Sequence, residues 1–260
     1  MPLLNFGYKI KSIVMPEGPS IIILKEAVQS FTGKEIISVS GNSSIDQQRL
    51  LHQKVIAFKS WGKHFLICFE DLTLRIHLLM FGTYRINERK LSPPRLSLTF
   101  KDGEINFYTC SIKYLEGNIN DHYDWSADVM NDQWNVKSAR KKLKAVPKQL
   151  VCDVLLDQDI FSGVGNIIKN EVLYRIKLHP ESRTGDIPPR KLNEMIDEAR
   201  IYSFQFLEWK KDFTLKKHWL AHTKKICIRC DLPLIKKYTG TKKRRSFFCE
   251  NCQKLYSKDE

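Results

Sequence analysis

The chain has 260 residues, a formal net charge of +14 and a pI of about 9.4. Its hydrophobic content of 42% and aromatic content of 11% exclude a disordered protein, and no apolar run approaches the roughly 20 residues of a membrane-spanning helix. The excess of lysine and arginine favours a polyanionic partner such as nucleic acid, although a solvated basic surface or ribosome association would also explain it.

The first half of the chain combines one helix with a series of strands. Residues 16–33 predict a helix, with Pro19 in its first turn and Gly33 at its end. From 35 to 116, short β-branched and aromatic runs alternate with turn residues. This part predicts an antiparallel β-sandwich with a helix attached.

The second half is predicted to be helical. Residues 117–136 are polar and are interpreted as a domain linker. The helices that follow are expected at 137–144, 148–156, 166–177, 188–210 and 214–222. We therefore expect an α+β multidomain protein, with a β-sandwich domain at 15–127, a helical domain at 128–222 and a short basic domain at 223–260.

The basic domain carries a metal-ligand pattern. Cys227, Cys230, Cys249 and Cys252 form two C-x2-C pairs, which suit one structural Zn²⁺ with four protein ligands. The other three cysteines stand alone in apolar surroundings, so a reducing cytosol is expected. Between the pairs, residues 242–245 read Lys-Lys-Arg-Arg. They predict a hairpin tip that binds phosphate, or otherwise a solvated charge run.

A glycine loop precedes the helix expected at 166–177. Residues 163–166 read Gly-Val-Gly-Asn, and amides at a helix N-terminus suit a phosphate. Gly165 and Asn166 are therefore candidate DNA-binding residues. A plain turn between two helices is the alternative explanation of the glycines alone.

Four motifs in order make the chain resemble the formamidopyrimidine-DNA glycosylase/endonuclease VIII family, from residue 15 to about 256. They are "MPEGP" at 15–19, "WGKHFL" at 61–66, the helix–two-turn–helix "GVGNIIKNEVL" at 163–173 and "RRSFFCENCQ" at 244–253. The resemblance implies an N-terminal β-sandwich, a helix–two-turn–helix domain and a zinc-finger hairpin around damaged double-stranded DNA.

The resemblance also implies catalytic residues. Pro16 would attack the sugar as an N-terminal secondary amine, Glu17 would move protons, and Lys63 would contact phosphate and support catalysis. Because an internal proline has no free amine, we expect Met15 to be the true start and residues 1–14 to be a leader absent from the working protein. Ser20 stands where the family often has a glutamate.

DNA-binding residues follow from the same resemblance. Asn166 and Arg244 would grip phosphate, with Arg245 as the neighbouring alternative to Arg244. A flipped nucleotide leaves a gap in the duplex, and three consecutive apolar residues match the wedge of the endonuclease VIII branch. These residues are Leu79, Met80 and Phe81, for which strand packing is the other explanation.

The implied activity is that of a bifunctional DNA glycosylase and AP lyase that removes oxidised pyrimidines and cuts by β,δ-elimination. An oxidised-purine glycosylase and a non-catalytic nucleic-acid-binding zinc protein are the alternatives. We expect a monomer that needs no protein partner, in the cytoplasm and associated with the nucleoid if the source is bacterial.

Overall fold

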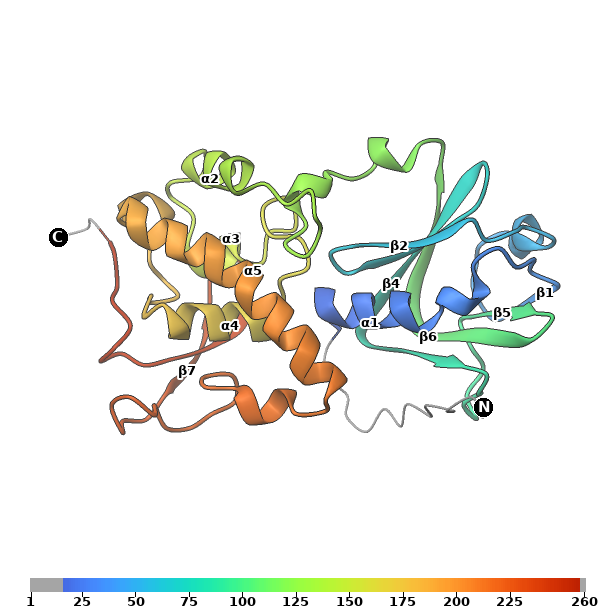
Figure 1. Ribbon diagram of the computed structural model, residues 1–260. Coiled ribbons are helices and arrows are strands. Elements are labelled where there is room, and N and C mark those ends of the chain that lie inside the picture. The colour runs from blue at the N-terminus through green and yellow to red at the C-terminus, as the bar shows by residue number, and fades with distance from the viewer. Residues whose placement is uncertain (1–15, 258–260) are drawn as a thin grey trace, which may run out of the picture.

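An antiparallel sheet and a group of helices lie next to each other in the computed structural model, which describes residues 16–257 (Figure 1). The expected leader and Met15 lie outside the described residues. The predicted α+β class is confirmed, with a cysteine-bearing hairpin near the C-terminus. Within the described range, no helix is both long enough and apolar enough to cross a bilayer.

The N-terminal helix α1 (Gly18–Ala27) is shorter than predicted and is followed by a 3-10 turn at Gln29–Phe31. Ile21 and Leu24 are fully buried against the sheet. The helix ends early because the chain turns to bring Phe31 against Phe100, with ring centroids 4.6 Å apart. This packing outweighs the helical pattern of the segment.

The strands form one six-stranded antiparallel sheet in the order β1-β5-β6-β4-β3-β2. Two long strands run through it and pair with each other along most of their length. The strands are β1 (Ser38–Ser40), β2 (Ala57–Trp61), β3 (His64–Cys68), β4 (Leu72–Ile86), β5 (Leu96–Phe100) and β6 (Gly103–Glu116).

A bulge interrupts the pairing of β4 with β6. Leu78 pairs with Cys110 and Thr83 with Tyr108, so four residues of β4 lie opposite the single residue Thr109. Thr109 adopts a positive φ of 53°. A bulge bends a strand and turns side chains out of the sheet, and here it lies at residues 79–82.

The helical region follows the predicted order with different lengths. Its helices are α2 (Val136–Lys144), α3 (Val151–Val154), α4 (Asn166–Arg175) and α5 (Pro189–Lys211). The remaining 3-10 turns are Gln47–Leu50, Ile119–Asp121, Trp125–Ala127, Thr184–Asp186 and Leu215–His218. Helices α4 and α5 pack against each other around a core that includes Ile168, Ile196 and Phe206.

Two predicted helices are largely absent. Of 148–156, only α3 is helical, because Leu150 is extended and forms a β-bridge with Arg183. Of 214–222, only a 3-10 turn remains. The backbone amides of residues 220–222 instead donate to the buried Glu171 carboxylate.

The segment predicted as a linker is packed against the sheet. Tyr123 lies against Trp61, with ring centroids 5.0 Å apart. The buried Asp128 accepts hydrogen bonds from the amides of Gly62 and Met130, both at 2.9 Å. This segment therefore fixes the β2–β3 turn against the helical region.

The C-terminal hairpin consists of β7 (Ile235–Thr239) and β8 (Arg244–Phe248), which pair in register. Its base packs on the end of α4 through Tyr174, Phe247 and Cys249. The hairpin thus extends from the cysteine cluster to a turn at residues 240–243, which contacts Asp153 of α3.

Candidate functional site

The carboxylate of Glu17 is buried at the N-terminus of α4. Glu17 is 1% exposed and accepts hydrogen bonds from the amides of Gly165, Ile167 and Ile168 at 3.2, 2.8 and 3.2 Å. Burial raises the pKa of this carboxyl, while the charge of Lys63 and the three amides lower it. Glu17 is therefore held in one orientation by a different part of the chain.

Glycines make this close approach possible. A side chain at Gly165 would place its Cβ 2.4 Å from the Glu17 carboxyl carbon. Gly18 donates from its amide to the carbonyl of Gly163 at 2.9 Å, and a Cβ on Gly18 would lie 3.0 Å from the Gly163 Cα. The glycine loop thus seats α1 on the helical region.

This finding changes the interpretation of the glycine loop. A helix N-terminus attracts an anion, and the anion at α4 is the Glu17 carboxylate of the same chain. The Gly165 amide, predicted to bind phosphate, donates to Glu17. The loop positions the Glu17 carboxylate, and the amides that it occupies are not open to a phosphate in this structure.

Lys63 lies in the turn between β2 and β3, directly after Gly62, whose φ is +52°. Burial lowers the pKa of Lys63, and the nearby Glu17 charge raises it. The positive charges of Arg244 and Lys242 lower it further. Lys63 therefore lies in the electrostatic field of both Glu17 and the C-terminal hairpin, as expected for one site.

Pro16 is half-buried and directly precedes Glu17. Nearby, the Ser20 hydroxyl accepts hydrogen bonds from the Glu17 amide at 3.3 Å and from the Lys210 ammonium at 2.8 Å. Burial lowers the pKa of Lys210 to about 8. The sequence did not single out Lys210, which reaches this site from the C-terminal end of α5.

Asn166 does not cap α4, because Gly165 occupies the N-cap position. Its side-chain amide donates to the Arg245 carbonyl at 3.0 Å. The ammonium of Lys169 and the amide of Asn170 donate to the same carbonyl, each at 3.3 Å. The first turns of α4 thus hold the middle of the hairpin, and Lys169, a fully buried cation, was missed by the sequence analysis.

The two hairpin arginines face different ways, as neighbours on a strand do. Arg245 is exposed and donates to the Tyr238 hydroxyl at 2.9 Å. Arg244 is half-buried, and its charge lowers the pKa values of Lys63 and Lys169. Arg244 is therefore the hairpin arginine closer to the Glu17 site.

The three residues predicted to form a wedge lie on the bulge of β4. Leu79, Met80 and Phe81 are 44%, 47% and 64% exposed, although they are large and apolar. Strand packing would bury at least some of them, so the explanation by ordinary packing is not supported. Exposed consecutive apolar residues suit insertion into a stack of bases.

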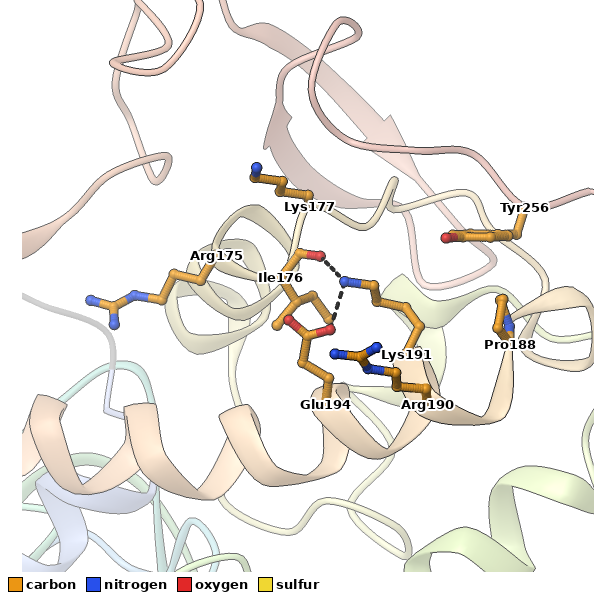
Figure 2. A pocket seen from close by; sticks show the side chains of 8 residues that line it. All are labelled: Arg175, Ile176, Lys177, Pro188, Arg190, Lys191, Glu194 and Tyr256. Carbon is orange, nitrogen blue, oxygen red and sulfur yellow. Dashed lines mark hydrogen bonds and ion pairs between the residues drawn. The ribbon is translucent and has the colours of Figure 1, made fainter.

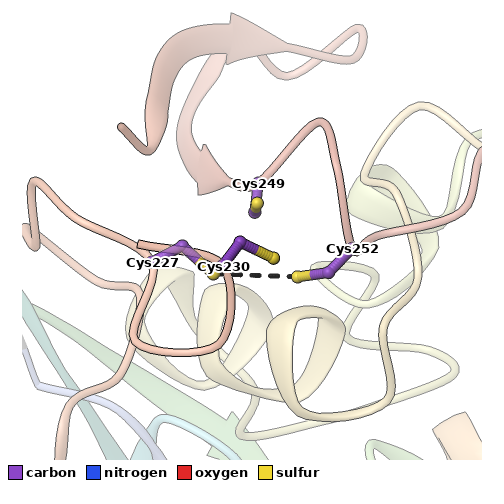
Figure 3. A group of neighbouring side chains, drawn as sticks. All are labelled: Cys227, Cys230, Cys249 and Cys252. Atoms are coloured by element: carbon purple, nitrogen blue, oxygen red, sulfur yellow. Dashed lines mark hydrogen bonds between the residues drawn. The ribbon is translucent and has the colours of Figure 1, made fainter. Parts of the chain in front are cut away.

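The four predicted metal ligands converge (Figure 3). All four sulfur atoms lie within 4.8 Å of one another, and those of Cys227 and Cys252 are 3.7 Å apart. Tetrahedral Zn²⁺ with bonds of about 2.3 Å requires sulfur separations of about 3.8 Å, so the arrangement fits zinc. The cluster comprises Cys227, Cys230, Cys249 and Cys252, and four protein ligands suit a structural rather than a catalytic ion.

A cavity of about 520 Å³ lies at the opposite end of α4 (Figure 2). Its Lys191 ammonium donates to the Ile176 carbonyl at 2.8 Å and pairs with Glu194 at 2.6 Å. Arg175 bonds to Glu198 and stacks on aromatic rings. The cavity is separate from the Glu17 site, because it lies at the C-terminal end of α4 and Glu17 binds the N-terminal end.

Comparison with known proteins supports this arrangement. The family model for the formamidopyrimidine-DNA glycosylase N-terminal domain matches residues 15–111, and the model for the H2TH domain of the same enzymes matches residues 126–202. Endonuclease 8-like 3 of Xenopus laevis is 27% identical over 84% of this chain, and the human protein is 25% identical over 95%. The matched parts cover 38% and 45% of those relatives, so the chain spans less than half of their length.

Two further comparisons cover nearly the whole length of the related protein. Formamidopyrimidine-DNA glycosylase of Mycoplasmopsis pulmonis is 26% identical over 92% of this chain and 98% of its own. The structure of the Lactococcus lactis enzyme bound to AP-site DNA has a TM-score of 0.82 at 20% identity, over 92% and 99% of the two chains. That likeness shows the fold. The matched family models and the site geometry lead to one conclusion: this chain belongs to the formamidopyrimidine-DNA glycosylase/endonuclease VIII family.

Proposed function

We propose that this protein is a DNA glycosylase and AP lyase of base excision repair, with Pro16 as nucleophile. The observation that carries the proposal is the Glu17 carboxylate, locked by three amides beside Pro16 and within the field of Lys63. A buried, oriented carboxyl next to a potential N-terminal amine is suited to proton transfer during covalent catalysis.

The chemistry would proceed in two stages. The Pro16 nitrogen attacks the sugar C1′, the bond from C1′ to the base breaks, and the base leaves with a proton. The C1′–O4′ bond then breaks, O4′ takes up a proton, and an iminium forms between C1′ and the nitrogen. The iminium makes the C2′ proton acidic, so its removal expels the 3′ phosphate, and a second elimination expels the 5′ phosphate. Glu17 would exchange protons with the opening sugar, and its raised pKa favours the protonated form that a general acid needs.

The DNA would lie across the basic face formed by the Lys63 turn and the hairpin. Arg244 and Lys63 would contact phosphates, and the apolar residues 79–81 would fill the gap left by the flipped nucleotide. Asn166 would act by holding the Arg245 backbone, which orients the hairpin. We further propose that the protein acts as a monomer.

We propose oxidised pyrimidines as the preferred substrates, because the three wedge residues are contiguous, as in the endonuclease VIII branch that the sequence resembles. Oxidised purines are the alternative. Single-turnover cleavage of duplexes that carry either 5-hydroxyuracil or 8-oxoguanine separates them. Faster cleavage of the purine lesion would overturn the substrate assignment.

The start of the chain tests the mechanism itself. Protein that begins at Pro16 should form a borohydride-trapped complex with abasic-site DNA, and protein that retains residues 1–15 should not, since only a terminal proline has a free secondary amine. Mass spectrometry must establish the N-terminus of each sample. Equal trapping by the intact longer chain would refute Pro16 as the nucleophile, and DNA binding without trapping by either would indicate a non-catalytic binding protein.

A further inference from the structure

The turn of the C-terminal hairpin is held by one buried carboxylate. Asp153 in α3 is 6% exposed. Its Oδ2 accepts hydrogen bonds from the amide and hydroxyl of Thr241 at 2.8 and 3.1 Å, and its Oδ1 accepts one from the Lys242 amide at 3.3 Å. Three donors from two adjacent residues converge on a group that water barely reaches.

The sequence of the turn fits this contact. Gly240 has a φ of +70°, and a Cβ at that position would lie 2.3 Å from the Asp153 Oδ1. A glycine is therefore required both by the backbone and by the approach of the carboxylate. The Lys242 ammonium also donates to the Leu156 carbonyl at 3.0 Å, directly after α3. The turn is thus docked on α3.

This contact is remote from the cysteine cluster along the hairpin. The pair Ile235–Phe248 lies beside Cys249 at the base, whereas the pair Thr239–Arg244 adjoins the turn. Arg244 lies between the turn that Asp153 holds and the Arg245 carbonyl that α4 holds. Zinc can fix the base of the hairpin, but the backbone on either side of Arg244 is held by the contacts of Thr241 and Lys242 with α3 and of Arg245 with α4.

An acidic residue here opposes the general electrostatics of the site. Asp153 lies next to Lys242 and near Lys169 on a face proposed to bind DNA. Its negative charge repels phosphates, so removing the charge alone should strengthen DNA binding. A buried carboxylate that accepts three hydrogen bonds also favours DNA binding, because it fixes the positions of the cationic residues around it. Loss of these hydrogen bonds should therefore weaken DNA binding.

We propose that Asp153 is a positioning residue of the DNA interface, which holds Arg244 and Lys242 toward the Lys63 turn independently of zinc. This inference rests on the proposed DNA-binding function. It assigns to α3 a role in binding, although α3 contributes no side chain to the DNA-contacting set itself.

The test is whether DNA affinity falls or rises when the Asp153 side chain is removed. Asp153→Ala should weaken binding to abasic-site duplex by about tenfold, the effect expected from losing a hydrogen bond to a charged group. Asp159→Asn is the matched control, since it removes a negative charge from an exposed side chain in the segment just after α3. The control should bind as tightly as the parent or more tightly. Zinc content should be the same in all three proteins.

A double-mutant cycle distinguishes positioning from a general structural effect. If Asp153 acts through Arg244, then Asp153→Ala should cost much less affinity in an Arg244→Ala background than in the parent. Full additivity, or an Asp153→Ala variant with parental affinity and salt dependence, would overturn the proposal. Asp153→Asn, which keeps one acceptor and the shape of the side chain, replaces the alanine variant if that variant does not fold.

Amide hydrogen exchange tests the contact without DNA. The Thr241 and Lys242 amides should exchange slowly in the parent and faster in Asp153→Ala or Asp153→Asn, while amides near the cysteine cluster stay unchanged. Fast exchange of both amides in the parent would refute the contact. A parent that fails to bind DNA but protects these amides would instead refute the proposed function.

Discussion

A methyl group added at Gly62 should push apart the Lys63 turn and the glycine loop, which together form part of the proposed active site. The turn that carries Lys63 meets the glycine loop at this residue, where a Cβ would lie 2.0 Å from the Ser162 Oγ and 2.8 Å from the Gly163 amide nitrogen. Ser162 is fully buried, and the Gly163 nitrogen belongs to the backbone. The Ser162 hydroxyl can rotate away, but the Gly163 nitrogen cannot move without disturbing the loop that leads into α4.

The cost of Gly62→Ala has two parts. A φ of +52° costs a residue with a Cβ roughly 1–2 kcal/mol, and overpacking of a buried contact costs about 1–3 kcal/mol. We therefore expect unfolding to become easier by about 2–5 kcal/mol. Gly33→Ala is the control, because Gly33 also has a positive φ, +81°, but a Cβ there would meet nothing within 4 Å. Gly33→Ala should therefore lose only the backbone contribution of roughly 1–2 kcal/mol.

Urea unfolding followed by tryptophan fluorescence compares the two variants. Single-turnover cleavage of an abasic-site duplex by protein that begins at Pro16 gives the functional consequence, since a displaced turn moves Lys63 relative to Glu17. Gly62→Ala should be slower than Gly33→Ala at saturating enzyme. Equal stability and equal cleavage rates for the two variants would refute the argument that the turn and the loop are in tight contact.

Further predictions address the metal, the buried lysine and the division of roles at the site. Cys249→Ser should lose zinc and DNA binding while circular dichroism still reports a folded sheet; normal zinc content would show that the cluster is not the metal site. Burial lowers the pKa of Lys169 to about 8 from 10.5, so the unfolded state holds more protons between these values and stability should rise with pH there, by up to about 3 kcal/mol. Lys169→Met should show a smaller rise than the parent in unfolding measured at pH 7.5 and 10, since Lys210, whose pKa is also lowered to about 8, still contributes; a rise identical to that of the parent would contradict the assignment. Glu17→Gln should bind lesion DNA almost normally but not release the base, as single-turnover cleavage would show. Arg244→Ala should weaken DNA binding and lower the slope of log affinity against log salt concentration by about one unit, as titration at several salt concentrations would show. Parental behaviour of either variant would refute the role assigned to that residue.

The local patterns in the sequence were sufficient for the order of the elements. The alternating strands from 35 to 116, the helix at 166–175 and the spacing of the four cysteines each carry a signal within a few residues. Helix ends were less predictable, since they depend on distant partners. The Glu171 carboxylate, for example, binds the amides of residues 220–222 and removes a predicted helix.

The contacts that build the site were not predictable from local patterns. The motif residues Pro16, Glu17 and Lys63 were expected, but the partner of the Glu17 carboxylate lies almost 150 residues away, at the glycine loop. The interpretation of that loop as a phosphate cradle failed because a loop that binds an anion does not reveal which anion it binds. Lys210 carried no local signal, and its role is visible only where α5 meets Ser20.

The most direct test of the central claim is to identify the residue that becomes attached to DNA. Protein that begins at Pro16 is reacted with abasic-site duplex, reduced with borohydride and digested, and the modified peptide is sequenced by mass spectrometry. Pro16 should carry the reduced sugar. Attachment at Lys63 or Lys210, two lysines whose charges interact with that of Glu17, would show that a lysine amine is the nucleophile and would contradict the account.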